Sequence, residues 1–168
     1  MKTKVKWFRY KIGFVVFMCA ALIVAINVMA ADSDGIVGVW NSEGHDARIE
    51  MFKCGVKYCG KIVWMDEPRY TVKDREGKPG DLKLDVKNPN PALRSRPILG
   101  LQFMHDFVFD GGNRWTGGRV YDPETGNTYR ASMSLVSINE LHLRGYIGIP
   151  LLGRTATWTR VKNLNGQK

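Results

Sequence analysis

The histidines and serines of this chain lack the spacing that catalysis needs. His45, His105 and His142 are far apart and show no metal-ligand pattern. Ser95 and Ser132 lie outside any G-x-S-x-G sequence, the turn that presents a nucleophilic serine in many hydrolases. The sequence therefore predicts no metal, no cofactor and no enzyme. A hydrolase is the alternative, and it would need histidines and acidic residues to cluster in the fold.

Two pairs of nearby carboxylates are the other candidates for acid–base chemistry. Asp66 and Glu67 are adjacent, and Asp122 and Glu124 flank Pro123. Both pairs lie in predicted turns, where acidic side chains usually cap the backbone or face solvent. We therefore expect structural carboxylates and not a catalytic pair.

Arginines are the polar residues best suited to a binding role. Arg94 and Arg96 could grip a carboxylate or phosphate with two guanidinium groups. The alternative is structural, with each arginine paired to a nearby acidic residue or donating to loop carbonyls. Arg119 shares its strand face with Trp115 and Tyr121, which would point it inward, where a buried charge needs a partner. The anionic head of a ligand would be such a partner.

Cys54 and Cys59 lie on the two sides of a predicted turn. In an oxidising compartment this spacing predicts a disulfide across a hairpin. A metal pair and a redox couple are the alternatives. However, two thiols without histidine partners make an incomplete zinc site, and thiol oxidoreductases use C-x-x-C. We expect the disulfide to hold the register of two strands.

The segments that carry these residues alternate between apolar and polar positions, as β-strands do. The predicted strand centres lie near residues 38, 50, 61, 105, 118, 131, 143 and 157. Strands spaced by about 8–12 residues are typical of an up-and-down barrel or sandwich. Residues 65–96 are polar and contain four prolines, which predicts one long loop between strands 3 and 4. Within this loop, Asn90 and Pro91 could start a short helical turn.

The inner faces of such a barrel either pack into a solid core or enclose a small ligand. Small-molecule pockets are mostly apolar, and the strands supply large aromatic residues for either role. The candidates for lining the interior are Trp64, Phe103, Trp115, Tyr121, Tyr146 and Trp158. In strand 4, Phe103, His105 and Phe107 are expected on one face, with Met104 and Asp106 on the other.

The first thirty residues have the features of a secretory signal peptide. Lysines and an arginine precede an apolar run at residues 12–26, and Ala30 suits signal peptidase. An uncleaved anchor is the alternative, although the run is shorter than the roughly 20 residues that span a bilayer. We therefore predict a signal peptide at residues 1–30, one domain at residues 31–168, and a periplasmic or secreted location. Cys19 would leave with the leader.

Removal of the leader changes the charge of the protein. The chain has 25 basic and 16 acidic residues, a net charge of +9, and the leader holds five of the basic residues and no acidic one. A charge of +4 remains, without a basic run interleaved with aromatics. We expect neither nucleic acid as a partner nor a stable membrane span in the mature chain. The sequence leaves the oligomeric state open.

Several motifs occur in order along the mature chain. They are Gly38-Val39-Trp40 and the segments 52–64, 88–97, 117–123 and 145–155. With these motifs the chain resembles a widespread group of small exported bacterial proteins catalogued as a domain of unknown function. The resemblance covers nearly all of the mature chain. It implies a lipocalin-like, calycin-type β-barrel in the periplasm or outside the cell, which binds a small hydrophobic or amphipathic ligand and has no established enzyme activity.

The resemblance also gives roles to Trp40 and Arg160. In lipocalins, a tryptophan of the first strand packs beneath an arginine of the last strand and closes one end of the barrel. The two residues match these positions. One departure from typical lipocalins is the C-terminus, where residues 163–168 form a short polar tail in place of a helix.

Two functional hypotheses follow from these patterns. The first is an exported, disulfide-bonded barrel that binds a small apolar or amphipathic molecule, with Arg94, Arg96 and Arg119 on an anionic head. The second is an envelope interaction or stress protein that docks a protein partner through its long loop and has no small-molecule ligand.

Overall fold

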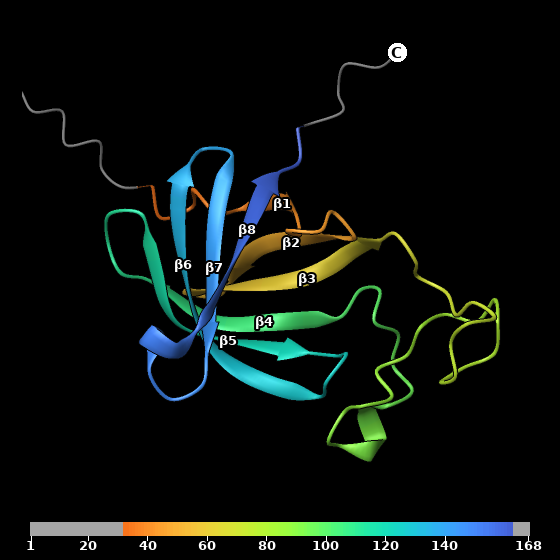
Figure 1. The fold of residues 1–168 in the computed structure, drawn as a ribbon. Coiled ribbons are helices and arrows are strands. Elements are labelled where there is room, and N and C mark those ends of the chain that lie inside the picture. Colours follow the sequence, from red (N-terminus) through yellow and green to blue (C-terminus); the bar gives the residue numbers. More distant parts are fainter. Residues whose placement is uncertain (1–31, 163–168) are drawn as a thin grey trace, which may run out of the picture.

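Eight antiparallel strands close into a barrel in the computed structural model, which describes residues 32–162 (Figure 1). Each strand pairs with its neighbour in sequence, and β1 pairs with β8. The strands are β1 (Gly38–Asn41), β2 (Ala47–Cys54), β3 (Lys57–Met65), β4 (Gln102–Phe109), β5 (Arg114–Asp122), β6 (Asn127–Ser137), β7 (Glu140–Tyr146) and β8 (Arg154–Arg160). The eight-stranded up-and-down barrel is thus confirmed. The predicted signal peptide lies outside the described residues.

The connections alternate between the two ends of the barrel. Tight hairpins at residues 55–56, 110–113 and 138–139 lie at one end, which we call the closed end. The connections at residues 42–46, 66–101, 123–126 and 147–153 lie at the other, the open end. The longest of them, residues 66–101, joins β3 to β4 as predicted and extends beside the barrel (Figure 1). It contains the short helix η1 (Pro91–Leu93), capped by the Asn90 side chain.

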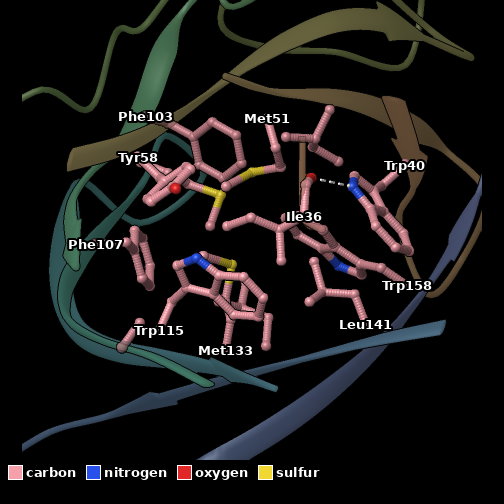
Figure 2. Close-up of a cluster of buried hydrophobic side chains, with 14 of the residues drawn as sticks. Ile36, Trp40, Met51, Tyr58, Phe103, Phe107, Trp115, Met133, Leu141 and Trp158 are labelled. Carbon is pink, nitrogen blue, oxygen red and sulfur yellow. Dashed lines mark hydrogen bonds between the residues drawn. The ribbon is translucent and has the colours of Figure 1, made fainter. Parts of the chain in front are cut away.

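The closed end is filled by large side chains from most of the strands (Figure 2). Trp40, Phe107 and Trp115 are fully buried there. The segment before β1 adds Ile36, whose carbonyl accepts a hydrogen bond from Trp40 Nε1 at 2.8 Å. The same segment reaches across the barrel, because the Trp115 indole donates to the Ser33 carbonyl at 3.1 Å. A solid core therefore occupies this half of the barrel.

Arg160, at the end of β8, makes contacts with several segments that meet at the closed end. Its guanidinium lies 4.1 Å from the centre of the Trp40 ring, a cation–π contact. The same group donates to three backbone carbonyls, those of Gly35, Val37 and Ile138. Burial lowers the pKa of Arg160, but a guanidinium stays charged at any ordinary pH. One side chain thus links the N-terminal segment, β1, β8 and the β6–β7 hairpin.

Gly38 is the residue that makes room for this contact. Its φ of 127° is one that side-chain-bearing residues rarely adopt. A Cβ at this position would lie 2.9 Å from Arg160 Nη1. The Gly38-x-Trp40 sequence therefore contributes to the position of Arg160 in two ways. Gly38 leaves space for the guanidinium, and the Trp40 ring packs against it.

The alternation predicted for β4 is wrong at its centre. Met104, expected on the outer face, is fully buried, whereas His105 is part-exposed with Nδ1 2.7 Å from the Asp106 carboxylate. The cause is irregular pairing with β3, where the register shifts on both sides of Gly60. Asp106 has a φ of 67°, so the chain bulges there and the alternation changes phase.

We expect Arg160→Ala to lower the free energy of unfolding by about 2–4 kcal/mol, since three carbonyls lose a charged donor and Trp40 loses its cation. Arg160→Lys keeps the charge without the planar fork and should lose about half as much. Urea unfolding followed by tryptophan fluorescence measures both. A loss below about 1 kcal/mol for Arg160→Ala would contradict the closing role.

The predicted disulfide is confirmed, because Cys54 at the end of β2 is bonded to Cys59 in β3. It closes a loop of only a few residues, so the double substitution to serine should cost about 2 kcal/mol on the chain-entropy model. We expect the variant to fold with an unchanged far-UV circular dichroism spectrum and a lower urea midpoint. Loss of the folded state at neutral pH would show that the bond has a larger role.

Candidate functional site

The open end of the barrel is hollow. A cavity of about 660 Å³ lies between β2, β3, the long loop and the β5–β6 turn. A second cavity of about 490 Å³ lies against β5, β6, β7 and β8, and Asp122 lines both. Volumes of this size are typical of pockets for small molecules.

The inner walls of both cavities are largely apolar. Ile62 and Leu143 belong to the buried core and also line the cavities, so the top of the core is the cavity floor. The remaining apolar lining consists of Ala47, Met65, Tyr70, Leu84, Val86, Ile98 and Pro123 in the larger cavity, and Val120, Tyr129 and Ala156 in the smaller one.

The rim of the larger cavity is acidic. Its carboxylates are Asp46, Asp66, Glu67, Asp74, Glu76, Asp122 and Glu124. The two lysines of the lining already have partners: Lys83 Nζ lies 3.4 Å from Glu67 and 3.8 Å from Asp74, and Lys87 Nζ lies 3.2 Å from Glu76. Within residues 32–162, the other four carboxylates form no ion pair. The rim therefore has an excess of negative charge.

Hydrogen bonds hold Asp74, one carboxylate of this rim, in its ionised form, and others order the β5–β6 turn. The backbone N–H and the hydroxyl of Thr71 donate to Asp74 at 2.6 and 2.8 Å, which lowers the pKa of that carboxyl. Asp122 accepts from the Glu124 N–H and the Thr125 hydroxyl at the β5–β6 turn. A charged rim of this kind attracts cationic or hydrogen-bond-donating groups and repels anions.

Arg119 lies outside the cavities. Gly117 has a φ of 73°, and the register of β5 with β6 shifts between Trp115 and Gly118. As a result, Trp115 and Gly118 are both buried although they lie three positions apart. After this bulge the alternation changes phase and Arg119 is exposed, opposite Arg130. The bulge explains why the expected inward arginine lies on the surface.

Tyr121 and Arg96 belong to an anchor of the long loop. Asp85 is fully buried and accepts from the Tyr121 hydroxyl, from Arg96 Nε and Nη2 at 2.9 and 2.8 Å, and from Asn88 Nδ2 at 2.8 Å. Because Val120 and Asp122 line the cavities, Tyr121 between them faces the outside of the barrel, where the loop covers it. The loop is thus fastened to β5 by one buried carboxylate.

The remaining predicted binding residues also have other neighbours. Arg94 Nε donates to the Asn88 carbonyl at 2.8 Å, and Arg96 is paired with Asp85, so both loop arginines make contacts of the kind that the structural alternative describes. Trp64 is paired with Arg48, whose guanidinium lies 4.7 Å from the ring centre. Tyr146 lies opposite the exposed Arg130. Neither cavity is lined by any of the seven residues predicted to bind a ligand, namely Trp64, Arg94, Arg96, Trp115, Arg119, Tyr121 and Tyr146.

Sequence reasoning missed Val120, Tyr129 and Ala156 of the smaller cavity. Tyr129 lies two positions before the buried Ala131, so the period-two pattern of β6 could have placed it inside. Val120 could not have been found this way, since the bulge at Gly117 interrupts the pattern of β5. No cluster of three or more potential metal ligands occurs within residues 32–162. In the same part of the chain, no helix has the length and apolarity needed to span a membrane.

Two of three comparisons relate this barrel to known proteins. The model of a family described as "Uncharacterized protein conserved in bacteria (DUF2147)" matches residues 38–160. A solved structure of HP1028 from the human pathogen Helicobacter pylori, described as belonging to the lipocalin family, superposes with a TM-score of 0.62. The two chains are 24% identical, and the match covers 76% of this chain and 84% of the other. A comparison with curated proteins gives no significant match. The likeness to HP1028 shows a shared lipocalin-like fold.

The loop anchor predicts a pH dependence of stability. Burial, together with the hydrogen bond to Asp85, raises the pKa of Tyr121 from 10.0 to about 12. This stabilisation is complete below pH 10 and is lost as the pH rises through 12, because the unfolded tyrosine ionises first. Tyr121→Phe should lower the free energy of unfolding by about 1–2 kcal/mol at pH 7 and show a shallower decline above pH 10.

Tyr146→Phe is the matched control, because that hydroxyl makes no hydrogen bond within the described residues. Urea unfolding at pH 7, 10 and 11.5 measures all three proteins. Equal slopes for the wild type and Tyr121→Phe would argue against a neutral, buried Tyr121.

Proposed function

This chain belongs to the DUF2147 family of uncharacterized bacterial proteins, and we propose that it binds a small amphipathic molecule in the hollow open end of its barrel. The apolar part of the ligand lies on the floor formed by Ile62 and Leu143. Its head group lies at the acidic rim and is cationic or donates hydrogen bonds. The polypeptide acts as a carrier or binding protein and performs no reaction on the ligand.

The observation that carries this proposal is the uneven filling of the barrel. The closed end contains the large fully buried side chains, whereas Val120, Tyr129 and Ala156 border open space at the other end. A barrel evolved only for stability would be expected to fill that space, because cavities lower the stability of a fold. A half-filled barrel suits a ligand that enters from one side.

The charge of the rim supports the choice of head group. An anionic head was expected from Arg94, Arg96 and Arg119, but these arginines lie outside the cavity lining. The lining contains carboxylates without ion-pair partners within the described residues, such as Asp66 and Glu124. An anionic head would be repelled there, whereas an ammonium or amide group would be attracted.

We also propose that the protein works in the periplasm or outside the cell. The signal peptide predicted at residues 1–30 is the main reason for proposing this location. The Cys54–Cys59 disulfide supports it, since disulfides persist in oxidising compartments.

We expect the purified protein to bind dodecyltrimethylammonium below its critical micelle concentration, and dodecyl sulfate at least about tenfold more weakly, because of the acidic rim. Ala156→Trp fills part of the smaller cavity and should weaken the binding of the cationic probe by about tenfold or more. Isothermal titration calorimetry measures both probes.

Thr159→Trp is the matched control, because it adds the same side chain to an exposed position of the same strand. Its affinity should stay within about twofold of the wild type, in keeping with a surface substitution. The proposal fails if a folded Ala156→Trp variant binds the probe as well as the wild type. Preference for dodecyl sulfate would overturn the assignment of the head group.

A further inference from the structure

The β7–β8 connection displays four large aliphatic side chains to solvent. Ile147, Ile149, Leu151 and Leu152 are 74, 56, 81 and 79% exposed. Single exposed apolar residues are common on protein surfaces, but four on one short loop form a patch that normally contacts something. The core does not need them, because the barrel is closed without this loop.

The loop is held in this exposed form by Arg144. Its guanidinium donates to the carbonyls of Pro150 and Leu151 at 2.8 and 3.1 Å, and to the Thr155 hydroxyl at 2.8 Å. Residues 150–152 form the short helix η2 (Pro150–Leu152). With its backbone tied to the side chain of β7, the loop cannot easily fold its aliphatic residues into the nearby cavity. Their exposure is therefore built into the local structure.

Basic residues border the same loop on the outer face of the barrel. Arg119 in β5 lies opposite Arg130 in β6, and Arg130 lies opposite Tyr146 in β7. Like charges placed directly across two strands lower stability, and within residues 32–162 neither arginine forms an ion pair. Arg154, where the loop ends, does not belong to this outer-face row, because it lines the smaller cavity with its Nη2 3.6 Å from Glu43. This row of positive charge leads to the apolar tip.

We propose that the loop at residues 147–152 docks the barrel onto an anionic lipid surface. The aliphatic side chains enter the boundary between head groups and acyl chains, and Arg119 and Arg130 bind lipid phosphates. Tyr146, directly before the loop, has the amphipathic ring that suits this boundary. The charge pattern favours an anionic lipid surface, because the exposed Arg119 and Arg130 have no ion-pair partner within residues 32–162 and their cross-strand row ends at Tyr146, directly before the loop.

The acidic rim sets the orientation of the docked barrel. Most of its carboxylates belong to the β1–β2 turn and the long loop, whereas the docking residues belong to β5, β6 and the β7–β8 connection. The barrel therefore lies tilted, with β5–β8 toward the lipid and the carboxylates of the β1–β2 turn and the long loop away from it. Docking does not require a ligand in the cavity, so the two proposals can succeed or fail separately.

Sedimentation with vesicles of phosphatidylglycerol and phosphatidylcholine tests the docking. We expect the wild type to bind these vesicles and to bind pure phosphatidylcholine much more weakly. Leu151→Ser combined with Leu152→Ser should reduce binding about tenfold, and Arg119→Gln with Arg130→Gln should reduce it severalfold and weaken its salt dependence. Circular dichroism confirms that each variant is folded.

Matched controls lie elsewhere on the surface. Val56→Ser with Val72→Ser removes two equally exposed aliphatic residues, and Lys73→Gln with Arg75→Gln removes two charges from the long loop. Both should leave vesicle binding within about twofold of the wild type.

The docking proposal is overturned if the wild type does not bind anionic vesicles, or if the Leu151→Ser/Leu152→Ser variant binds them as well as the wild type does. A self-association that this variant abolishes, without vesicle binding by the wild type, would make the loop a protein interface. If the wild type does not bind vesicles but still binds dodecyltrimethylammonium, the docking proposal is wrong and the cavity proposal is retained.

Discussion

The structure depends on the contact between Arg160 and the closed end of the barrel. A barrel of eight strands must join its last strand to its first, and the β1–β8 pairing is short. Arg160 strengthens that seam with a ring stack on Trp40 and with hydrogen bonds to backbone carbonyls on both sides of it. Because a guanidinium has five donors in one plane, a single residue can satisfy groups that the strands leave unpaired.

Closing one end so firmly allows the other end to remain hollow. The dry core around Trp40, Trp115 and Phe107 supplies apolar burial for the fold. The open end can therefore keep cavities that would be costly in a barrel without such a core. The long loop contributes a wall to the larger cavity, and the Asp85 anchor holds that wall against β5. Stability and binding are in this way assigned to opposite ends of one barrel.

The arginines show how the same residue type takes different roles in one small domain. Arg160 and Arg144 organise backbone carbonyls, and Arg96 neutralises a buried carboxylate. Arg119 and Arg130 face solvent without an ion-pair partner in the described part of the chain. The first group is explained by structure alone. The second group is not, and for that reason it points to an external partner with negative charge.

The sequence by itself determined the barrel and its disulfide, and the family resemblance implied the closing pair of Trp40 and Arg160. Strand spacing, the turn residues, Gly38-x-Trp40 and the Cys54/Cys59 hairpin are local signals, because each depends on residues close together in the chain. The lining of the cavity was decided only by the tertiary structure. Bulges near Gly60, Asp106 and Gly117 change which residues face inward, and a period-two pattern cannot show them. Tyr121 of β5 likewise meets Asp85 only when the long loop folds onto the barrel.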